Sequence, residues 1–296
     1  SGSGTSGGGG EAVYTVQGSG NTLRYNDKPF FWLPWMAGST QELPLEYVSP
    51  RFSSDRGFVL ETGWNLFSLF GQQAPDGVNA IGRLDYQGNH GAGFGADLTY
   101  DVPDMLGNFN GYFLPYDNGT DHIQGREDVE QSFAQRGFLH WQHRQYLPRD
   151  LELSFEAAYV TDPTFLDEFY PEQSETAKQY ETSLYVKKQV DDWAVTLLAK
   201  YNLNDFLAQS KFLETPGYQT DKLPELGYYR VGKSLWDDRL TYYSENRLSW
   251  MRFRFATDTP SDLGFNTRWS RELFNMGPNT SFEDNAEKLG YYFERA

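Results

Sequence analysis

The stretch Leu151-Glu-Leu-Ser-Phe-Glu-Ala-Ala-Tyr159, followed by Asp162-Pro-Thr-Phe-Leu-Asp-Glu-Phe169, decides the fold class. Apolar side chains occupy every second position from Leu151 to Tyr159, and polar ones such as Glu152 and Glu156 lie between them. Successive side chains of a strand point to opposite faces, so one face is apolar and the other polar. This pattern is typical of a transmembrane β-strand. An Asp-Pro pair then ends the strand, and an aromatic loop follows it.

The composition favours an ordered protein rich in β-structure. Of the 296 residues, 39% are hydrophobic and 22% charged, which is the range of ordered proteins. Aromatic residues make up 17% of the chain, which suits the aromatic girdles of an outer-membrane barrel and also a secreted carbohydrate-binding sandwich. The longest strongly apolar stretch, residues 30–37, contains Pro34 and is far shorter than the roughly 20 residues that a spanning helix needs.

Charge and cysteine usage exclude several classes of function. The net charge of −16 argues against a nucleic-acid partner, because a phosphate-binding surface needs clustered cations. The absence of cysteine excludes disulfides, thiolate metal sites and cysteine nucleophiles. Residues 1–10 are Gly- and Ser-rich and resemble a flexible linker, and no signal-peptide pattern opens the chain.

Eleven strands are predicted between residues 44 and 255. The six clearest form three hairpins with short charged turns: Gly137–Leu147 and Leu151–Val160 around Pro148-Arg149-Asp150, Tyr180–Val190 and Trp193–Leu203 around Asp191-Asp192, and Glu225–Leu235 and Arg239–Trp250 around Asp237-Asp238. The earlier ones are Pro44–Phe52, Gly57–Phe70, Val78–Tyr86, Ala92–Tyr100 and Asn108–Tyr116. Most match the roughly 9 to 11 residues that a tilted strand needs to cross a bilayer.

The predicted connections alternate between short and long. The turns at 148–150, 191–192 and 237–238 are tight, whereas the connections at 117–135, 162–179 and 204–224 are long, polar and acidic. Outer-membrane barrels have short periplasmic turns and longer external loops. Counting strands places all three long connections at one rim, opposite the 13–36 segment. The alternative is a soluble β-sandwich or propeller, whose strands are usually only about 5 to 6 residues long.

A proline-aromatic segment precedes the strand series. It reads Tyr25-Asn-Asp-Lys-Pro29-Phe-Phe-Trp-Leu-Pro34-Trp-Met and follows short strand-like pieces at 13–17 and 22–25. Taken alone, it fits an ordinary apolar edge strand that prolines interrupt. Its position ahead of the strands suggests instead the end of a preceding β-domain.

Taken in order, this segment and the Thr161-Asp-Pro-x-Phe-Leu-x-Glu-Phe169 motif resemble the LptD family, the outer-membrane lipopolysaccharide assembly proteins. The resemblance covers roughly residues 22–255. It implies a periplasmic β-jelly-roll that leads into a very large transmembrane barrel. The implied task is passage of lipopolysaccharide through the lumen and a lateral seam into the outer leaflet. The implied partners are a plugging lipoprotein like LptE and a periplasmic bridge like LptA.

The resemblance also suggests which residues line the lipid path. Candidates for lipid passage and gating are Pro29, Phe30, Phe31, Leu33, Pro34, Pro44 and Pro50, and the family-motif loop contributes Asp162, Pro163, Phe165, Leu166 and Phe169. Pro44 and Pro50 both fall in the first predicted barrel strand and are six residues apart. Equal parity predicts that both missing N–H donors weaken one and the same ladder, although both prolines could instead only mark strand ends.

No constellation of residues predicts catalysis, and we expect no enzyme, cofactor or metal site. Asp191-Asp192 and Asp237-Asp238 occupy hairpin tips, where Asp is favoured for turn geometry. His140 and His143 are three apart in a strand and therefore face opposite ways. No nucleophile elbow, zinc-protease motif or phosphate loop is present.

We therefore predict an all-β protein of the bacterial outer membrane with a periplasmic N-terminal portion. Residues 1–10 form the linker-like start, 11–43 the end of the jelly-roll and the crossover, and 44–296 the N-terminal part of an incomplete barrel. Polar positions such as Glu152, Glu156 and Lys200 are expected to face the lumen. Two alternatives are a general porin or uptake barrel and a soluble secreted carbohydrate-binding β-protein.

Overall fold

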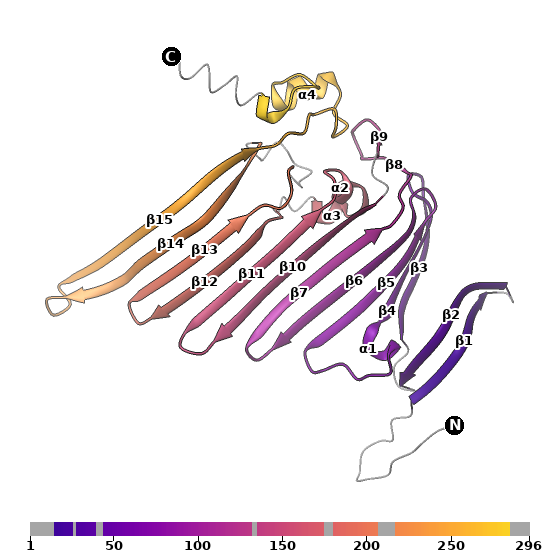
Figure 1. Cartoon of the computed structure of the whole chain (residues 1–296), viewed down its shortest axis with the longest axis horizontal. Coiled ribbons are helices and arrows are strands. Elements are labelled where there is room, and N and C mark those ends of the chain that lie inside the picture. Colours follow the sequence, from indigo (N-terminus) through magenta and orange to yellow (C-terminus); the bar gives the residue numbers. More distant parts are fainter. Residues whose placement is uncertain are drawn as a thin grey trace, which may run out of the picture.

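The computed structural model describes residues 15–25, 28–39, 44–131, 135–174, 180–206 and 217–284. Its main element is a sheet of eleven antiparallel strands (Figure 1). In sheet order these are β15 (Leu240–Phe255), β14 (Tyr218–Leu235), β13 (Trp193–Tyr201), β12 (Thr182–Val190), β11 (Leu151–Val160), β10 (Arg136–Leu147), β7 (Met105–Leu114), β6 (Gly91–Val102), β5 (Val78–Gln87), β4 (Gly57–Asn65) and β3 (Leu45–Ser53). The prediction of an all-β fold with eleven strands is confirmed. The sheet is not closed, since β3 and β15 each lack a second neighbour among the described strands.

The short hairpin turns end the strands where Asp-rich sequence predicts them. Arg149, Asp150 and Asp191 adopt positive φ, a backbone conformation that Asp and Asn enter more readily than most residues. The third turn differs from the prediction, because it spans Trp236–Arg239 rather than two residues. Trp236, Asp237 and Asp238 all have positive φ there, and the N–H of Arg239 donates to the carbonyl of Trp236.

Three predicted strand boundaries are wrong by five residues or more, and one of them is the end of β15, which lies at Phe255 rather than Trp250. β14 begins at Tyr218 rather than Glu225, so the preceding connection is shorter than the predicted 204–224 loop. A register shift between Lys222 and Glu225 accommodates Pro224, which has no N–H to give to the ladder. β4 ends at Asn65 rather than Phe70, because the Asn65 side chain accepts a hydrogen bond from the Ser68 N–H and begins helix α1 (Leu66–Leu69).

The long connections gather at one end of the sheet, which Figure 1 shows at the top. They carry β8 (Thr120–Asp121), β9 (Val129–Glu130), α2 (Phe165–Phe169) and α3 (Pro171–Ser174). At the opposite end lie α1 and the hairpin of β1 (Thr15–Tyr25) and β2 (Lys28–Ser39), which is a separate two-stranded sheet (Figure 1). For the described parts of the connections, the prediction that they lie at the rim opposite the 13–36 segment is confirmed.

Beyond β15 the described chain leaves the sheet. Residues 256–284 fold over the rim of the long connections and contain α4 (Thr267–Phe274), which Asn266 caps at its N-terminus (Figure 1). The barrel assignment of residues 44–296 included this segment, in which the described residues 256–284 form α4 and turns and contain no strand. The linker-like residues 1–10 lie outside the described residues. In the described ranges, no helix is long and apolar enough to cross a membrane.

Candidate functional site

The sheet has one apolar and one polar face. Register pairs Phe94 with Phe113 and Leu184 with both Phe155 and Ala199 on the apolar face, where large side chains remain exposed. The other face carries charged ladders such as Glu152, which lies 3.0 Å from the Lys187 ammonium and 3.4 Å from the Arg144 guanidinium. Glu152, Glu156 and Lys200 all lie on this polar face, as predicted.

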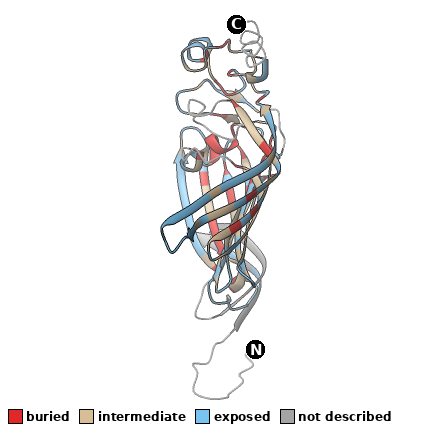
Figure 2. Cartoon of the chain, turned by 90° about the vertical axis from the view of Figure 1, so that its left-hand side faces the viewer, coloured by how far each residue is buried: buried red, intermediate tan, exposed pale blue. Residues whose placement is uncertain are grey.

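Helix α2 covers the rim end of the polar face. Phe165 is fully buried against Phe138 of β10, and Tyr170 contacts Phe138 and Tyr112 of β7. Figure 2 shows that buried residues concentrate in this region, where the helices lie against the curved sheet. The family-motif loop therefore contributes Phe165, Leu166 and Phe169 to the larger hydrophobic core of the described residues.

A saturated ion-pair cluster lies beneath these connections. Arg136, at the start of β10, is 0% exposed and uses all five of its N–H donors on three carboxylates. Asp162 accepts from Nε at 3.0 Å and from Nη2 at 2.8 Å, and Asp121 accepts from Nη1 at 2.7 Å and from Nη2 at 2.9 Å. Asp117 accepts from Nη1 at 2.8 Å. We call these four residues, together with Thr164, the Arg136 cluster.

The three carboxylates of the Arg136 cluster outnumber its one guanidinium, and further hydrogen-bond donors stabilise them. The hydroxyl of Thr164 and the amide of Gln131 donate to Asp121. Buried His90 donates from Nδ1 to Asp117 at 2.9 Å, and the N–H of Gly119 donates to the same carboxylate at 2.8 Å. A Cβ at Gly119 would lie 2.4 Å from the His90 ring, so only glycine allows this close approach.

The carboxylates at the rim differ in the direction of their pKa shifts because their hydrogen-bond donors differ. Burial acts to raise the pKa of Asp117, but hydrogen bonds from His90, Gly119 and Arg136 outweigh it and hold this pKa below its usual range. Burial raises the pKa of Asp167 in α2, and the Arg126 guanidinium only partly opposes that shift. Asp117 is thus an ionised anchor of the cluster.

Two more arginines fix α2 to distant parts of the chain. Arg56, in the β3–β4 turn, lies 3.3 Å from the Glu168 carboxylate and also donates to the Glu168 carbonyl. Arg126 pairs with Asp167 at 2.9 Å and lies over the Phe265 ring, which belongs to the segment after β15. Four segments that are far apart in sequence therefore meet at α2.

The predicted gating prolines do not act on one ladder. Pro44 lies just before β3, and its carbonyl accepts a hydrogen bond from the N–H of Asn65 in β4 at 2.7 Å. Pro50 lies within β3 opposite Leu60, beyond a one-residue register shift between Leu45 and Tyr47. Alternate residues of an antiparallel strand bond to the same neighbour. The extra residue in β3 between Pro44 and Pro50 therefore reverses their relative parity and makes their N positions point to opposite sides of the strand.

The reversed parity turns Pro50 away from β4. Phe58, two residues from Leu60 in β4, accepts a hydrogen bond from Gly88 on the β5 side, so Leu60 bonds toward β5 as well. Pro50, opposite Leu60, therefore directs its missing donor to the unpaired edge of β3. The prediction that both prolines weaken the same ladder is wrong.

Of the remaining predicted residues, those of the proline-aromatic segment are far from the Arg136 cluster, whereas those of the family-motif loop lie at it. Pro29, Phe30, Phe31, Leu33 and Pro34 all lie in β2, where Phe31 pairs with Leu23 and Leu33 with Asn21 of β1. Asp162, Pro163, Phe165, Leu166 and Phe169 are brought together at the rim, and four of these five side chains are buried or contact the Arg136 cluster.

Sequence analysis missed Arg136, His90, Asp117 and Asp121. His90, Asp117 and Asp121 fall in predicted turns or loops, and Arg136 falls directly before a predicted strand. Charged side chains at such positions are usually solvated. A usable signal was the isolated Arg136 between two acid-rich connections, since a cation at that position can be shared by both.

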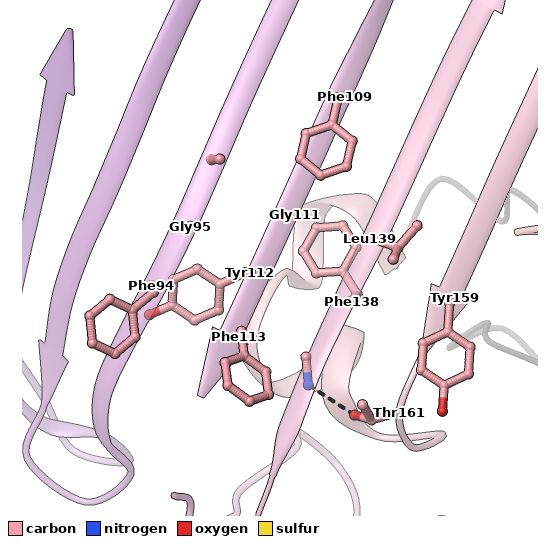
Figure 3. Close-up of a pocket in the computed structure, with 12 residues that line it drawn as sticks. Phe94, Gly95, Phe109, Gly111, Tyr112, Phe113, Phe138, Leu139, Tyr159 and Thr161 are labelled. Carbon is pink, nitrogen blue, oxygen red and sulfur yellow. Dashed lines mark hydrogen bonds between the residues drawn. The ribbon is translucent and has the colours of Figure 1, made fainter. Parts of the chain in front are cut away.

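The apolar face carries a groove near the rim. It has a volume of about 510 Å³ and is lined by the aromatic side chains of Phe94, Phe109, Phe113 and Tyr159 together with Gly95 and Gly111 (Figure 3). The N–H of Gly137 donates to the Thr161 hydroxyl at one end of it, at 3.0 Å (Figure 3). No group of three or more His, Asp or Glu side chains in the described ranges has the geometry to hold a metal ion.

Comparison with known proteins adds no family to these observations: the chain matches no protein-family model, and a search of curated proteins finds no relative. The fold and the site define an antiparallel β-protein with one apolar face, one polar face and a buried ion-pair cluster at one rim.

Proposed function

We propose that this chain is part of an outer-membrane translocon that inserts lipopolysaccharide into the outer leaflet through a lumen and a lateral seam. The observation that carries the proposal is the division of an eleven-strand sheet into an exposed apolar face and a charged face. Soluble monomers rarely expose apolar patches larger than a few hundred Å². A barrel wall in lipid requires such a division, with alternating side chains facing lipid and lumen.

The choice of an amphiphilic cargo is supported by the unpaired edge at β3. Pro50 removes a donor from that edge, which weakens any strand pair formed there by about 1 kcal/mol for the missing bond. A seam that opens sideways would let acyl chains leave while sugars stay on the polar face. The order of the proline-aromatic segment and the Asp162-to-Phe169 motif, similar to the LptD family, points to the same cargo and to partners like LptE and LptA.

Membrane insertion can be tested with a charge on each face. Leu197 lies on the apolar face and Ser183 on the polar face. Leu197→Arg should cost about 2 to 4 kcal/mol if the residue lies near the bilayer centre. It should therefore reduce insertion into lipid vesicles, measured by heat-modifiable mobility on electrophoresis. Ser183→Arg is the matched control, and equal insertion of both variants would contradict a membrane position and favour a soluble protein.

The cargo needs a separate experiment. Bacteria depleted of their own lipopolysaccharide translocon should regain lipopolysaccharide at the cell surface when they express the full-length protein that contains this chain. A porin or uptake barrel, the second candidate, would conduct ions in planar bilayers without restoring surface lipopolysaccharide. That combination of results would replace the proposed function by the second candidate.

A further inference from the structure

A small pocket lies between the polar face of the sheet and the end of α2. Its volume is about 140 Å³, and its walls include Arg83, Asp85 and Gln87 of β5, Tyr112 of β7, Phe169 of α2 and Tyr47 of β3. Tyr47 is 41% exposed, and its ring lies so close over Gly63 that a Cβ there would overlap it. The pocket thus has aromatic sides, and its outer wall lies on the strand at the unpaired edge of the sheet.

Two buried polar atoms of this pocket form no hydrogen bond to a described residue, namely Arg83 Nε, which lies 2.9 Å from the Asp97 carboxylate, and Gln87 Oε1. Gln87 is only 3% exposed, and its amide nitrogen donates weakly to the Tyr112 hydroxyl at 3.4 Å. Its carbonyl oxygen Oε1 makes no hydrogen bond to any described residue. A buried acceptor without a donor is costly, so the pocket is built for an occupant that brings a hydroxyl or N–H group.

The two arginines around the pocket are already paired. Arg83 lies 2.9 Å from Asp97 and donates to the Tyr170 hydroxyl at 2.9 Å, and Arg56 pairs with Glu168. An anionic ligand would find no free cation here, whereas the Asp85 carboxylate, which accepts from the Thr62 N–H, can also accept from the hydroxyl groups of a neutral ligand. The lining is mostly polar, with Arg56, Glu61 and Asp85 among the charged groups, and Tyr47, Tyr112 and Phe169 add aromatic rings against which an apolar ring face can pack.

Size and position narrow the ligand further. The volume equals that of about four or five water molecules, which is close to that of one sugar ring with its hydroxyls. We propose that the pocket binds a single neutral sugar residue of a glycolipid's saccharide portion through Gln87, Asp85 and the ring of Tyr47. The choice of a glycolipid rests on the proposed function, whereas sugar binding itself does not. A sugar held here would lie beside the β3 edge. From there, the acyl chains of the same glycolipid could reach the apolar face.

Binding can be measured without transport. The complete chain, folded in detergent micelles, is titrated with lipid-free core oligosaccharide released from lipopolysaccharide, using saturation-transfer NMR and calorimetry. We expect millimolar binding that weakens about tenfold in Gln87→Met, which keeps the side-chain length but removes the acceptor. Tyr47→Ala removes a partly exposed wall and should weaken binding similarly, so it serves if Gln87→Met does not fold. Gln189→Met, an exposed position on the polar face outside the pocket, is the control.

Three outcomes would overturn the inference. These are absence of binding to the unaltered chain, equal binding by all variants, and displacement of the sugar by inorganic phosphate. The first means that only water fills the pocket, the second places the sugar elsewhere, and the third makes the ligand an anion. If the protein binds the sugar but restores no surface lipopolysaccharide, the sugar site is supported and the proposed function is rejected. If it restores surface lipopolysaccharide but does not bind the sugar, only the sugar site is rejected.

Discussion

Arg136 is the residue on which the rim architecture depends most. It is fully buried and balances three carboxylates that lie on two separate connections. A buried guanidinium in this arrangement is expensive to desolvate, but its removal leaves its partners as uncompensated buried charges. The arrangement therefore specifies one way of folding residues 117–131 and 162–174 together.

Arg136→Met should destabilise the packing of both connections by about 3 to 5 kcal/mol, because three buried carboxylates lose their only shared cation. Hydrogen exchange should rise across residues 117–131 and 162–174. The control is Arg144→Met in the same strand, whose side chain is half exposed and pairs with Glu152 at the surface. Unchanged exchange in Arg136→Met would mean that aromatic packing alone orders the rim.

Asp258 makes the segment after β15 sensitive to pH. Burial, and secondly the nearby Asp262 carboxylate, raise the pKa of Asp258 to about 6. The folded chain thus holds this proton up to about pH 6, whereas the unfolded chain loses it near 3.8. Stability contributed by this segment is highest below about pH 4, falls as pH rises to about 6, and stays low above that.

Asp258→Asn should remove this penalty and stabilise residues 256–284 at pH 7.5 by on the order of 1 to 2 kcal/mol. It should change little at pH 4. Hydrogen exchange of the segment at both pH values provides the measurement, with Glu283→Gln as an exposed control in the same segment. A stabilisation of equal size at both pH values would show that the effect is not electrostatic.

At the scale of elements, α2 links the rim connections to the sheet. Its five residues are all buried, and ion pairs from Arg56 and Arg126 reach its two acidic side chains from other segments. A helix this short has little stability of its own in water. Tertiary contacts therefore supply its order, which explains why periodicity in the sequence did not predict it.

Phe165→Ala should cost about 3 to 5 kcal/mol, because the ring is fully buried between Phe138, Phe169 and the Arg136 guanidinium. The matched control is Phe52→Ala, since Phe52 is 83% exposed on edge strand β3. Thermal unfolding followed by mobility on unheated gels would measure both. A loss of similar size at Phe52 would mean that the apolar face is covered in the folded protein.

Strands and helices differed in how well sequence predicted them. The eleven strands were predictable because alternation with a period of two marks each strand directly, as along Leu151–Tyr159. Two predicted strand boundaries were wrong where a single side chain determines the boundary. Asn65 does so by capping α1, and Pro224 does so through the register shift beside it. The Arg136 cluster was not predictable, since its partners lie 15, 19 and 26 residues away and nothing local marks their meeting.

At the scale of the whole molecule, the two edges of the sheet that lack a neighbour among the described strands are unequal. β15 presents a long edge, whereas β3 carries Pro50 with its missing donor turned outward. Prolines on edge strands reduce pairing with other strands. Any closure of the sheet at β3 is therefore weakened at one defined position.

Substitutions of the two prolines give a matched pair of variants that tests the proposed lateral seam. Pro50→Ala restores a donor that faces the unpaired edge, and Pro44→Ala restores one that faces β4. One added ladder bond is worth about 1 kcal/mol, or roughly a fivefold change in an opening equilibrium. If the chain acts in the translocon proposed above, Pro50→Ala should slow the arrival of lipopolysaccharide at the cell surface about fivefold, while Pro44→Ala should leave it unchanged. Heat-modifiable mobility confirms that each variant is folded. Equal export by both variants would mean that the prolines only end strands and do not weaken a seam. Slower export by Pro44→Ala alone would mean that the weakened strand pair is β3 with β4.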